Sequence, residues 1–153
     1  KTGMRIVLDT HILESAILGS RSGEMTSGLK LIDFIRVECP VVLQTPSLAR
    51  ELRGQLHRKG VRFPGQFPAF IKDLERERKL RRLPESAIGE LSVEQRRSLI
   101  GSLQNDGHVF LAALRGDRVI ITHDPRMIEH RRNLEAAFDV SILDVEDVPL
   151  PAD

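Results

Sequence analysis

Four short apolar runs, separated by stretches with helical spacing, constrain the fold of this chain more than any other feature. The runs are residues 5–8, 41–43, 119–122 and 140–143. Short runs of mainly apolar residues are typical of strands buried on both faces, and strands that alternate with helices indicate a parallel sheet covered on both sides. We therefore expect a three-layer α/β/α (Rossmann-like) fold around a mostly parallel sheet of about four to five strands.

Helices are expected between these runs, with boundaries set by capping and breaking residues. Thr45-Pro46 begins one helix, since proline at the first helical position loses no hydrogen bond. Ser92 and Gln95 form a capping box that begins another. The expected helices cover, in chain order, residues 10–18, 24–37, 45–60, 69–80, 92–103, 105–115 and a short segment from 125, and residues 81–84 are expected to be a short strand or turn.

Length and composition indicate one globular domain. The 153 residues suffice for a sizeable core, and we place a single domain at 4–148, with 149–153 as a short tail and 1–3 as a cloning remnant. The chain has no Trp or Tyr, which disfavours single-strand binding on an aromatic stacking platform. Cys39 is the only cysteine, and no signal peptide or membrane span is visible, so we expect a cytoplasmic protein.

Charge is distributed unevenly although the net charge is only +1. Residues 50–82 hold eleven Lys or Arg against four Asp or Glu, whereas residues 133–153 hold six acids and no Lys or Arg. A basic middle fits a surface that faces a polyanion. Solvated helix faces with internal ion pairs explain it equally well.

Four acidic residues, Asp9, Glu51, Asp106 and Asp124, lie where apolar elements end or where the following helix begins. Each has a plain explanation on its own: a strand end, an exposed helical residue, a first-turn acid and a helix N-cap, respectively. Together they come from four separate elements that should meet at the carboxyl edge of a parallel sheet, where ligands bind. Gathered carboxylates repel one another, so the pattern indicates a site for a hard divalent cation.

These residues resemble the PIN-domain nucleases, and in particular the prokaryotic PIN proteins found as toxins of toxin–antitoxin pairs. The resemblance extends from residue 4 to about 148 and is carried by the blocks MRIVLDTHIL (4–13), TPSLAREL (45–52), NDGHVFLAAL (105–114) and VIITHDPRMI (119–128). Residues 60–90 match the family poorly. Two positions depart from its pattern, because His11 stands where Asn is usual and His123 where Asn or Gly is frequent.

The resemblance implies a divalent-metal-dependent endoribonuclease that leaves a 5′-phosphate and a 3′-hydroxyl. Asp9, Glu51, Asp106 and Asp124 would hold Mg²⁺ or Mn²⁺, with Asp9 as the central ligand and Glu51 serving a second ion or a bound water. Thr10 and Thr122 would be the polar residues that accompany the first and last acids. An antitoxin protein and a homodimer are the partners that the family suggests, and no membrane is expected.

Substrate contacts are expected from cations and histidines near the acids. The candidates for binding the RNA backbone are Arg50, Arg53, Arg58, Lys59, His11 and His123. Phosphate contacts of this kind would make binding strongly dependent on salt and largely independent of sequence. For His11, His108 and His123 a hydrogen-bonded structural role is the simpler interpretation.

Two other classes of protein with acids at a sheet edge require residues that this chain lacks at the matching positions. A response-regulator receiver needs a second acid beside the first, and a haloacid-dehalogenase-type phosphatase needs Asp at position 11, where this chain has His. Both fit poorly. A PIN-fold protein that no longer cuts and serves as a binding or scaffolding module is the alternative that the sequence leaves open.

Overall fold

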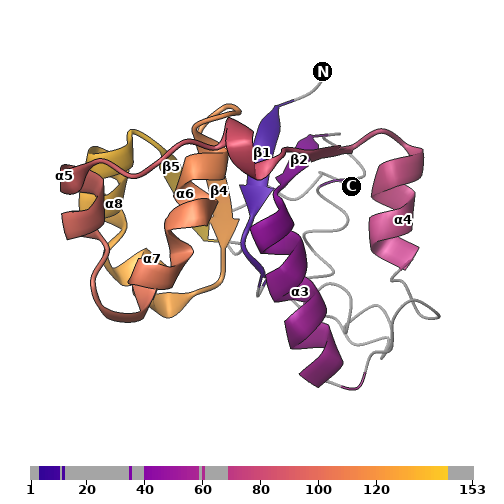
Figure 1. Ribbon diagram of the computed structural model, residues 1–153, viewed down its shortest axis with the longest axis horizontal. Coiled ribbons are helices and arrows are strands. Elements are labelled where there is room, and N and C mark those ends of the chain that lie inside the picture. Colours follow the sequence, from indigo (N-terminus) through magenta and orange to yellow (C-terminus); the bar gives the residue numbers. More distant parts are fainter. Residues whose placement is uncertain are drawn as a thin grey trace, which may run out of the picture.

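The core of the protein is a five-stranded, all-parallel sheet in the computed structural model, which describes residues 4–10, 12, 35, 40–58, 60 and 69–144. The strands are β1 (Arg5–Leu8), β2 (Val41–Gln44), β3 (Leu80–Arg82), β4 (Val119–Thr122) and β5 (Ser141–Asp144). Their order is β3-β2-β1-β4-β5, so β1 lies in the middle and pairs with both β2 and β4 (Figure 1). The chain therefore reverses its direction of travel across the sheet beside β1, and such a switch point opens a crevice at the carboxyl ends of the strands.

Helices connect the strands and cover the sheet. They are α3 (Pro46–Arg58), α4 (Ala69–Arg76), α5 (Val93–Ser98), α6 (Gly107–Ala113), α7 (Pro125–Glu129) and α8 (Arg131–Phe138), with 3₁₀ turns η1 (Glu85–Ala87) and η2 (Gly101–Asp106). Figure 1 shows α3 and α4 on the side of β2, and α5, α7 and α8 on the side of β5. No helix in the described residues combines the length and the apolar character needed to cross a bilayer.

Two hydrophobic clusters, one on each face of the sheet, create the three layers. Successive side chains of a strand point to opposite faces. Accordingly, Ile6 and Leu8 belong to one cluster with Leu52 and Leu56 of α3. Val7 belongs to the other, which α6, α7 and α8 complete. The predicted three-layer α/β arrangement is confirmed, and the sheet is parallel throughout.

The predicted strands occur at their expected places, with small shifts at their ends. β2 extends to Gln44, and β5 begins at Ser141. The Ser92 capping box is present, since the Ser92 hydroxyl accepts from the Gln95 amide and the Gln95 side chain accepts from the Ser92 amide. The helices expected over 10–18 and 24–37 lie largely outside the described residues, although Thr10, Ile12 and Ile35 are helical.

Two helix boundaries were wrong, and one helix was not predicted. The helix expected over 69–80 ends at Arg76, because Arg78 adopts a left-handed conformation (φ 59°) and the Lys79 amide bonds back to the Leu74 carbonyl at 2.7 Å. The helix expected to reach 103 ends at Ser98, and Gly101 (φ 60°) introduces the 3₁₀ segment η2. The unpredicted helix is α8.

Candidate metal centre

Asp9 is a buried carboxylate held by neutral donors. It follows β1 directly and is only 3% exposed. Its Oδ1 accepts the Thr10 amide at 2.8 Å, and its Oδ2 accepts the Thr122 hydroxyl at 2.9 Å. Because β1 and β4 are adjacent, the last residue of β4 reaches the residue after β1. Hydrogen bonds to the charged form lower the cost of burying Asp9.

Thr122 also fixes Asp124 at the start of α7. The fully buried Thr122 hydroxyl accepts the Asp124 amide at 2.9 Å while donating to Asp9. The Asp124 Oδ1 accepts the Arg126 amide at 2.9 Å, as an N-cap should. Asp124 thus performs the capping role that its sequence position indicated, and its side chain also lines the pocket described below.

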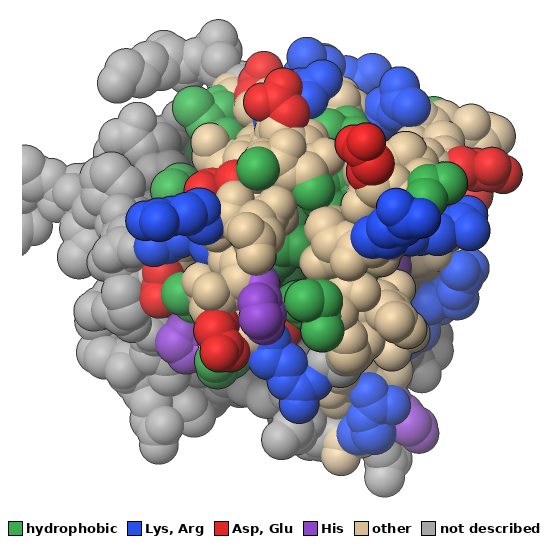
Figure 2. Space-filling view, turned by 90° about the vertical axis from the view of Figure 1, so that its left-hand side faces the viewer, with side chains coloured by type: hydrophobic (Ala, Val, Ile, Leu, Met, Phe, Trp, Pro, Cys, Tyr) green, Lys and Arg blue, Asp and Glu red, His purple; other side chains and the backbone are tan. Residues whose placement is uncertain are grey.

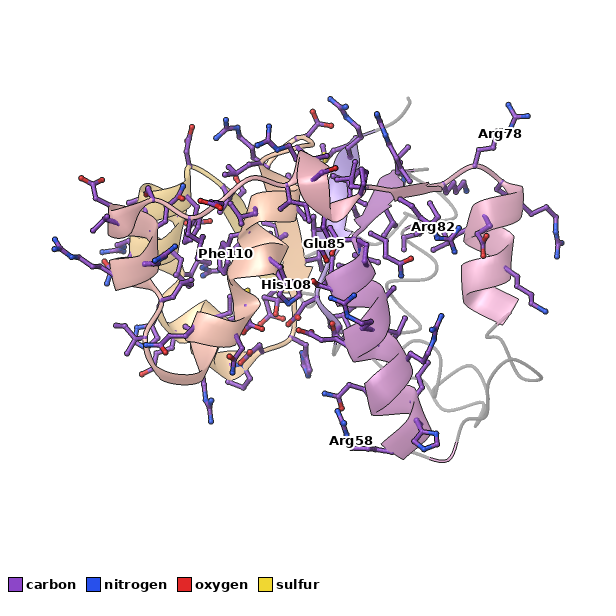
Figure 3. The ribbon with its side chains drawn as sticks, in the orientation of Figure 1. Arg58, Arg78, Arg82, Glu85, His108 and Phe110 are labelled. Carbon is purple, nitrogen blue, oxygen red and sulfur yellow. The ribbon has the colours of Figure 1, made fainter. Side chains whose placement is uncertain are left out.

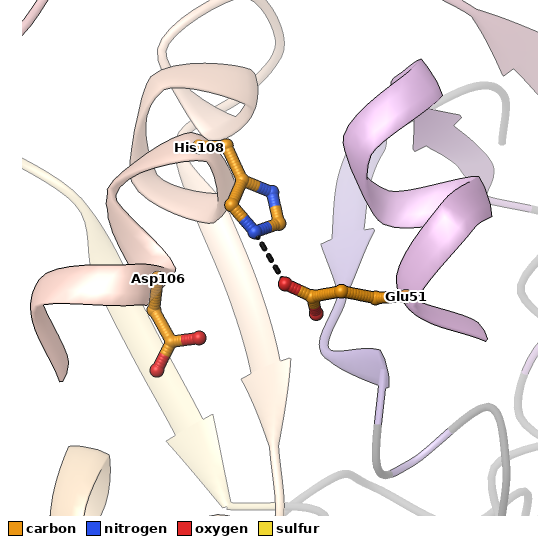
Figure 4. Close-up of side chains that lie close together, drawn as sticks. All are labelled: Glu51, Asp106 and His108. Atoms are coloured by element: carbon orange, nitrogen blue, oxygen red, sulfur yellow. Dashed lines mark hydrogen bonds and ion pairs between the residues drawn. The ribbon is translucent and has the colours of Figure 1, made fainter. Parts of the chain in front are cut away.

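Glu51 lies between two side-chain donors from different elements. It occupies the second turn of α3, where Thr10 donates its hydroxyl to Oε1 at 2.8 Å. On its other side, His108 of α6 places Nε2 2.7 Å from Oε2 (Figure 4). Thr10 therefore connects two acids, since its amide holds Asp9 and its hydroxyl holds Glu51.

The pKa of Asp106 is affected by the charges of the other three acids. This residue precedes α6 and makes no capping hydrogen bond through its side chain. Burial raises the pKa of Asp106 to about 7, with further contributions from the charges of Asp9, Glu51 and Asp124, while His108 opposes the shift. Coulombic repulsion of this kind requires proximity, so the four acids share one electrostatic environment.

An open pocket of about 750 Å³ lies at this edge of the sheet. Three of the four acids line it, and the lining residues are Glu51, Gln55, Asn105, Asp106, His123, Asp124, Pro125 and Arg126. Within the described part of the chain, Glu51, Asp106 and His108 also form a group whose ligand atoms all lie within 4.8 Å of one another. These three residues could hold a metal ion.

His108 is half-buried and asymmetrically hydrogen-bonded. Burial opposes the charged ring, but the hydrogen bond with Glu51 and the charges of Glu51, Asp106 and Glu85 outweigh it, so the pKa of His108 is raised. Its Nδ1 is buried and has no hydrogen-bond partner among the described residues. The ring thus has one nitrogen that bonds Glu51 and one buried nitrogen without a partner among the described residues.

The candidate substrate-binding residues that the structure describes fall into two groups. His123 lines the pocket, whereas none of the three arginines, Arg50, Arg53 and Arg58, is among the described residues that line it. Arg58 lies at the far end of α3 from His108 (Figure 3). Arg50 is 71% exposed and lies 3.7 Å from Glu85. Lys59 and His11 lie outside the described residues.

The basic stretch includes several ion pairs. Arg82 bonds Glu75 at 3.0 Å, and Lys79 lies 3.5 Å from Glu77. On the face of the molecule seen in Figure 2, Lys and Arg side chains alternate with acidic ones. Exposed pairs of this kind contribute little to stability, but they reduce the positive charge that the stretch offers to a polyanion.

Sequence reasoning did not identify three of the polar residues at the site, and it gave His108 a hydrogen-bonded role without naming its partner. Gln55 follows Glu51 by one helical turn, so helical periodicity could have placed it on the same face. Asn105 and Arg126 adjoin two of the acids in sequence. His108, two residues after Asp106, carried no signal that would pair it with Glu51 on a distant helix.

Comparisons with protein families, with characterised proteins and with solved structures found no match to this chain. The functional assignment therefore depends on the residues of the pocket and on their geometry.

Proposed function

We propose that this chain is a divalent-metal-dependent endoribonuclease of the PIN-domain type, which hydrolyses RNA phosphodiester bonds. It would act as the toxin of a toxin–antitoxin pair or as a related RNA-processing nuclease. Asp9, Glu51, Asp106 and Asp124 form its metal-binding set, and Mg²⁺ or Mn²⁺ is its cofactor.

The observation that carries this proposal is the electrostatic coupling of four acids from four separate elements. The pKa of Asp106 is raised to about 7 by burial and by the charges of the other three acids. A protein that needed these residues only for capping or solubility would gain nothing from placing them where they repel one another. A divalent cation removes the repulsion, and carboxylate oxygens are the ligands that Mg²⁺ and Mn²⁺ prefer.

The residues of the pocket fit phosphodiester hydrolysis. When bound, the metal lowers the pKa of a coordinated water and neutralises charge on the attacked phosphate. Asp9 and Asp124 are held by hydrogen bonds with Thr10, Thr122 and the Arg126 amide, so their positions are fixed before any ligand arrives. Such preorganisation is what metal-dependent catalysis requires of its ligands.

Replacement of Asp9 by Asn tests the proposal. Asn retains the size of Asp9 and can still bond Thr122, but it removes the negative charge from the centre of the network. We expect Asp9→Asn to lose Mn²⁺-dependent cleavage of RNA by at least about a hundredfold. Cleavage would be followed on a mixed RNA substrate, and sequencing of the products should show 5′-phosphate and 3′-hydroxyl ends.

Asp139→Asn is the matched control. Asp139 is 92% exposed, is not among the described residues that line the pocket, and has a left-handed backbone (φ 55°) that Asn tolerates well. The control should cleave like the wild type. Equal cleavage by a folded Asp9→Asn protein would refute the assignment. Binding of Mn²⁺ and RNA without cleavage by the wild type would favour a silent binding module.

A further inference from the structure

The donors around Glu51 suggest a role for His108. Both oxygens of Glu51 accept a hydrogen bond, one from the Thr10 hydroxyl at 2.8 Å and one from His108 Nε2 at 2.7 Å. Thr10 is itself 2% exposed and anchored through its amide to Asp9. The Glu51 side chain is therefore held at two points, although it is long and 37% exposed and would otherwise sample several rotamers.

By distance alone His108 could instead be a nitrogen ligand of the metal, because its ring lies in one group with Glu51 and Asp106. Two observations oppose that role. A histidine that binds a metal almost always donates its other ring N–H to a carboxylate, a backbone carbonyl or a water. Nδ1 of His108 is buried and has neither a carboxylate nor a backbone carbonyl as a partner among the described residues. Moreover, a metal at Nε2 would have to replace the 2.7 Å hydrogen bond with Glu51.

We propose that His108 is a positioning residue, which together with Thr10 holds the Glu51 carboxylate at the wall of the pocket as a hydrogen-bond donor and not as a metal ligand. This inference rests on the proposed function. His108 Nε2 donates to one oxygen of the Glu51 carboxylate, and the Thr10 hydroxyl donates to the other. Glu51 is thereby preorganised to orient a ligand or a water in the pocket.

A double-mutant cycle tests whether His108 acts through Glu51. The proteins are the wild type, His108→Leu, Glu51→Ala and the double variant, with His108→Gln added because Gln retains an N–H donor of similar reach. Mn²⁺-dependent RNA cleavage and Mn²⁺ affinity would be measured for each. We expect His108→Leu to lose about 10- to 100-fold, His108→Gln to recover most of that loss, and the double variant to be no worse than Glu51→Ala.

Two further measurements complete the test. Pulsed electron paramagnetic resonance of the Mn²⁺-loaded protein would detect a nitrogen atom bonded directly to Mn²⁺. We expect the wild type and His108→Gln to give the same ¹⁴N spectrum, because His108 is not a ligand. The same cycle applied to urea unfolding of the metal-free proteins should show that Glu51 and His108 are coupled, which separates positioning from misfolding. His57→Leu, at an exposed position near the end of α3, is the control and should behave like the wild type.

The outcomes separate this inference from the proposed function. If the wild type cleaves RNA but the losses of His108→Leu and Glu51→Ala multiply, the role of His108 is wrong and the nuclease proposal stands. A ¹⁴N coupling that disappears in His108→Gln would likewise overturn the positioning role. If the wild type neither binds Mn²⁺ nor cleaves RNA, the proposed function fails, and the role of His108 fails with it.

Discussion

Asp9 and Asp106 are two acids of the candidate site that differ in the hydrogen-bond donors around them. Asp9 is almost fully buried but accepts hydrogen bonds from Thr10 and Thr122. Asp106 is less buried, makes no capping hydrogen bond, and is repelled by three other acids. Hydrogen bonds favour the charged form of a carboxyl, whereas burial and like charges favour its neutral form. Asp9 thus has a neutral donor at each of its oxygens, whereas the pKa of Asp106 is raised by burial and by the neighbouring acids.

The raised pKa of Asp106 predicts a pH dependence of stability in the metal-free protein. An unfolded chain releases this proton near its ordinary pKa of 3.8, whereas the folded protein retains it up to about pH 7. Between these values the folded state binds more protons, so its stability falls as pH rises and levels off above pH 7. Asp106→Asn removes this loss. We expect it to be more stable than the wild type at pH 8 by the order of 1–2 kcal/mol, after allowance for partial exposure.

Urea unfolding at pH 5 and pH 8 with EDTA present measures this difference. The advantage of Asp106→Asn should be smaller at pH 5, where most of the wild-type Asp106 is already neutral. Asp139→Asn, at an exposed position, should leave the pH profile unchanged. An advantage of Asp106→Asn that is the same at both pH values would show that Asp106 keeps an ordinary pKa.

At the scale of elements, the connection from α6 to β4 depends on close packing. Gly116 lies between the two elements, and a Cβ atom there would come within 2.8 Å of the Arg5 carbonyl oxygen and 2.6 Å of Leu43 Cδ1. One of these atoms belongs to the backbone of β1, so rotamer changes alone cannot make room. The glycine therefore allows α6 to approach the sheet closely, and α6 carries His108 and follows Asp106.

Gly116→Ala should consequently destabilise the protein by about 1–3 kcal/mol. Gly54→Ala is the matched control, because its Cβ would meet only Arg58 at 3.7 Å and the residue lies inside α3. There the better helix propensity of Ala should stabilise the protein by up to about 1 kcal/mol. Thermal or urea unfolding of both variants checks the opposite signs, and a neutral Gly116→Ala would contradict the packing argument.

Some helices and strands could be predicted from short stretches of sequence, and others could not. The Ser92 cap and the four apolar strands were predictable because their signals lie within a few residues. The end of α4 was not, since a non-glycine residue, Arg78, takes the left-handed conformation there. α8 was also missed, because no side-chain cap marks its start. For these elements the tertiary structure overrides local preference.

The same distinction applies to the candidate site. That acids would gather at the carboxyl edge could be predicted, since parallel strands align their ends. The hydrogen bond between Glu51 and His108 could not, because it joins side chains 57 residues apart on two helices whose packing is set by the core. Likewise, the sequence placed Arg58 near the end of the expected helix but did not show that this end lies away from the pocket.

At the scale of the whole molecule, the repulsion among the acids should make stability sensitive to divalent cations. A ligand that binds only the folded state stabilises it by about 2.7 kcal/mol at a concentration one hundred times its Kd. We expect Mn²⁺ to raise the thermal unfolding temperature of the wild type relative to the EDTA-treated protein, and to have a much smaller effect on Asp106→Asn. Equal shifts in both proteins would place the binding of Mn²⁺ elsewhere.

The central position of β1 has a consequence for how the protein is made. The Arg5–Leu8 strand can pair with β2 early, but Asp9 acquires its Thr122 partner only after β4 has been translated and has docked beside it. Asp106 and Asp124 also belong to the last third of the chain. A nascent polypeptide on the ribosome therefore lacks the pocket. An activity of the proposed kind would arise only after β4 and the start of α7 have emerged and β4 has docked beside β1.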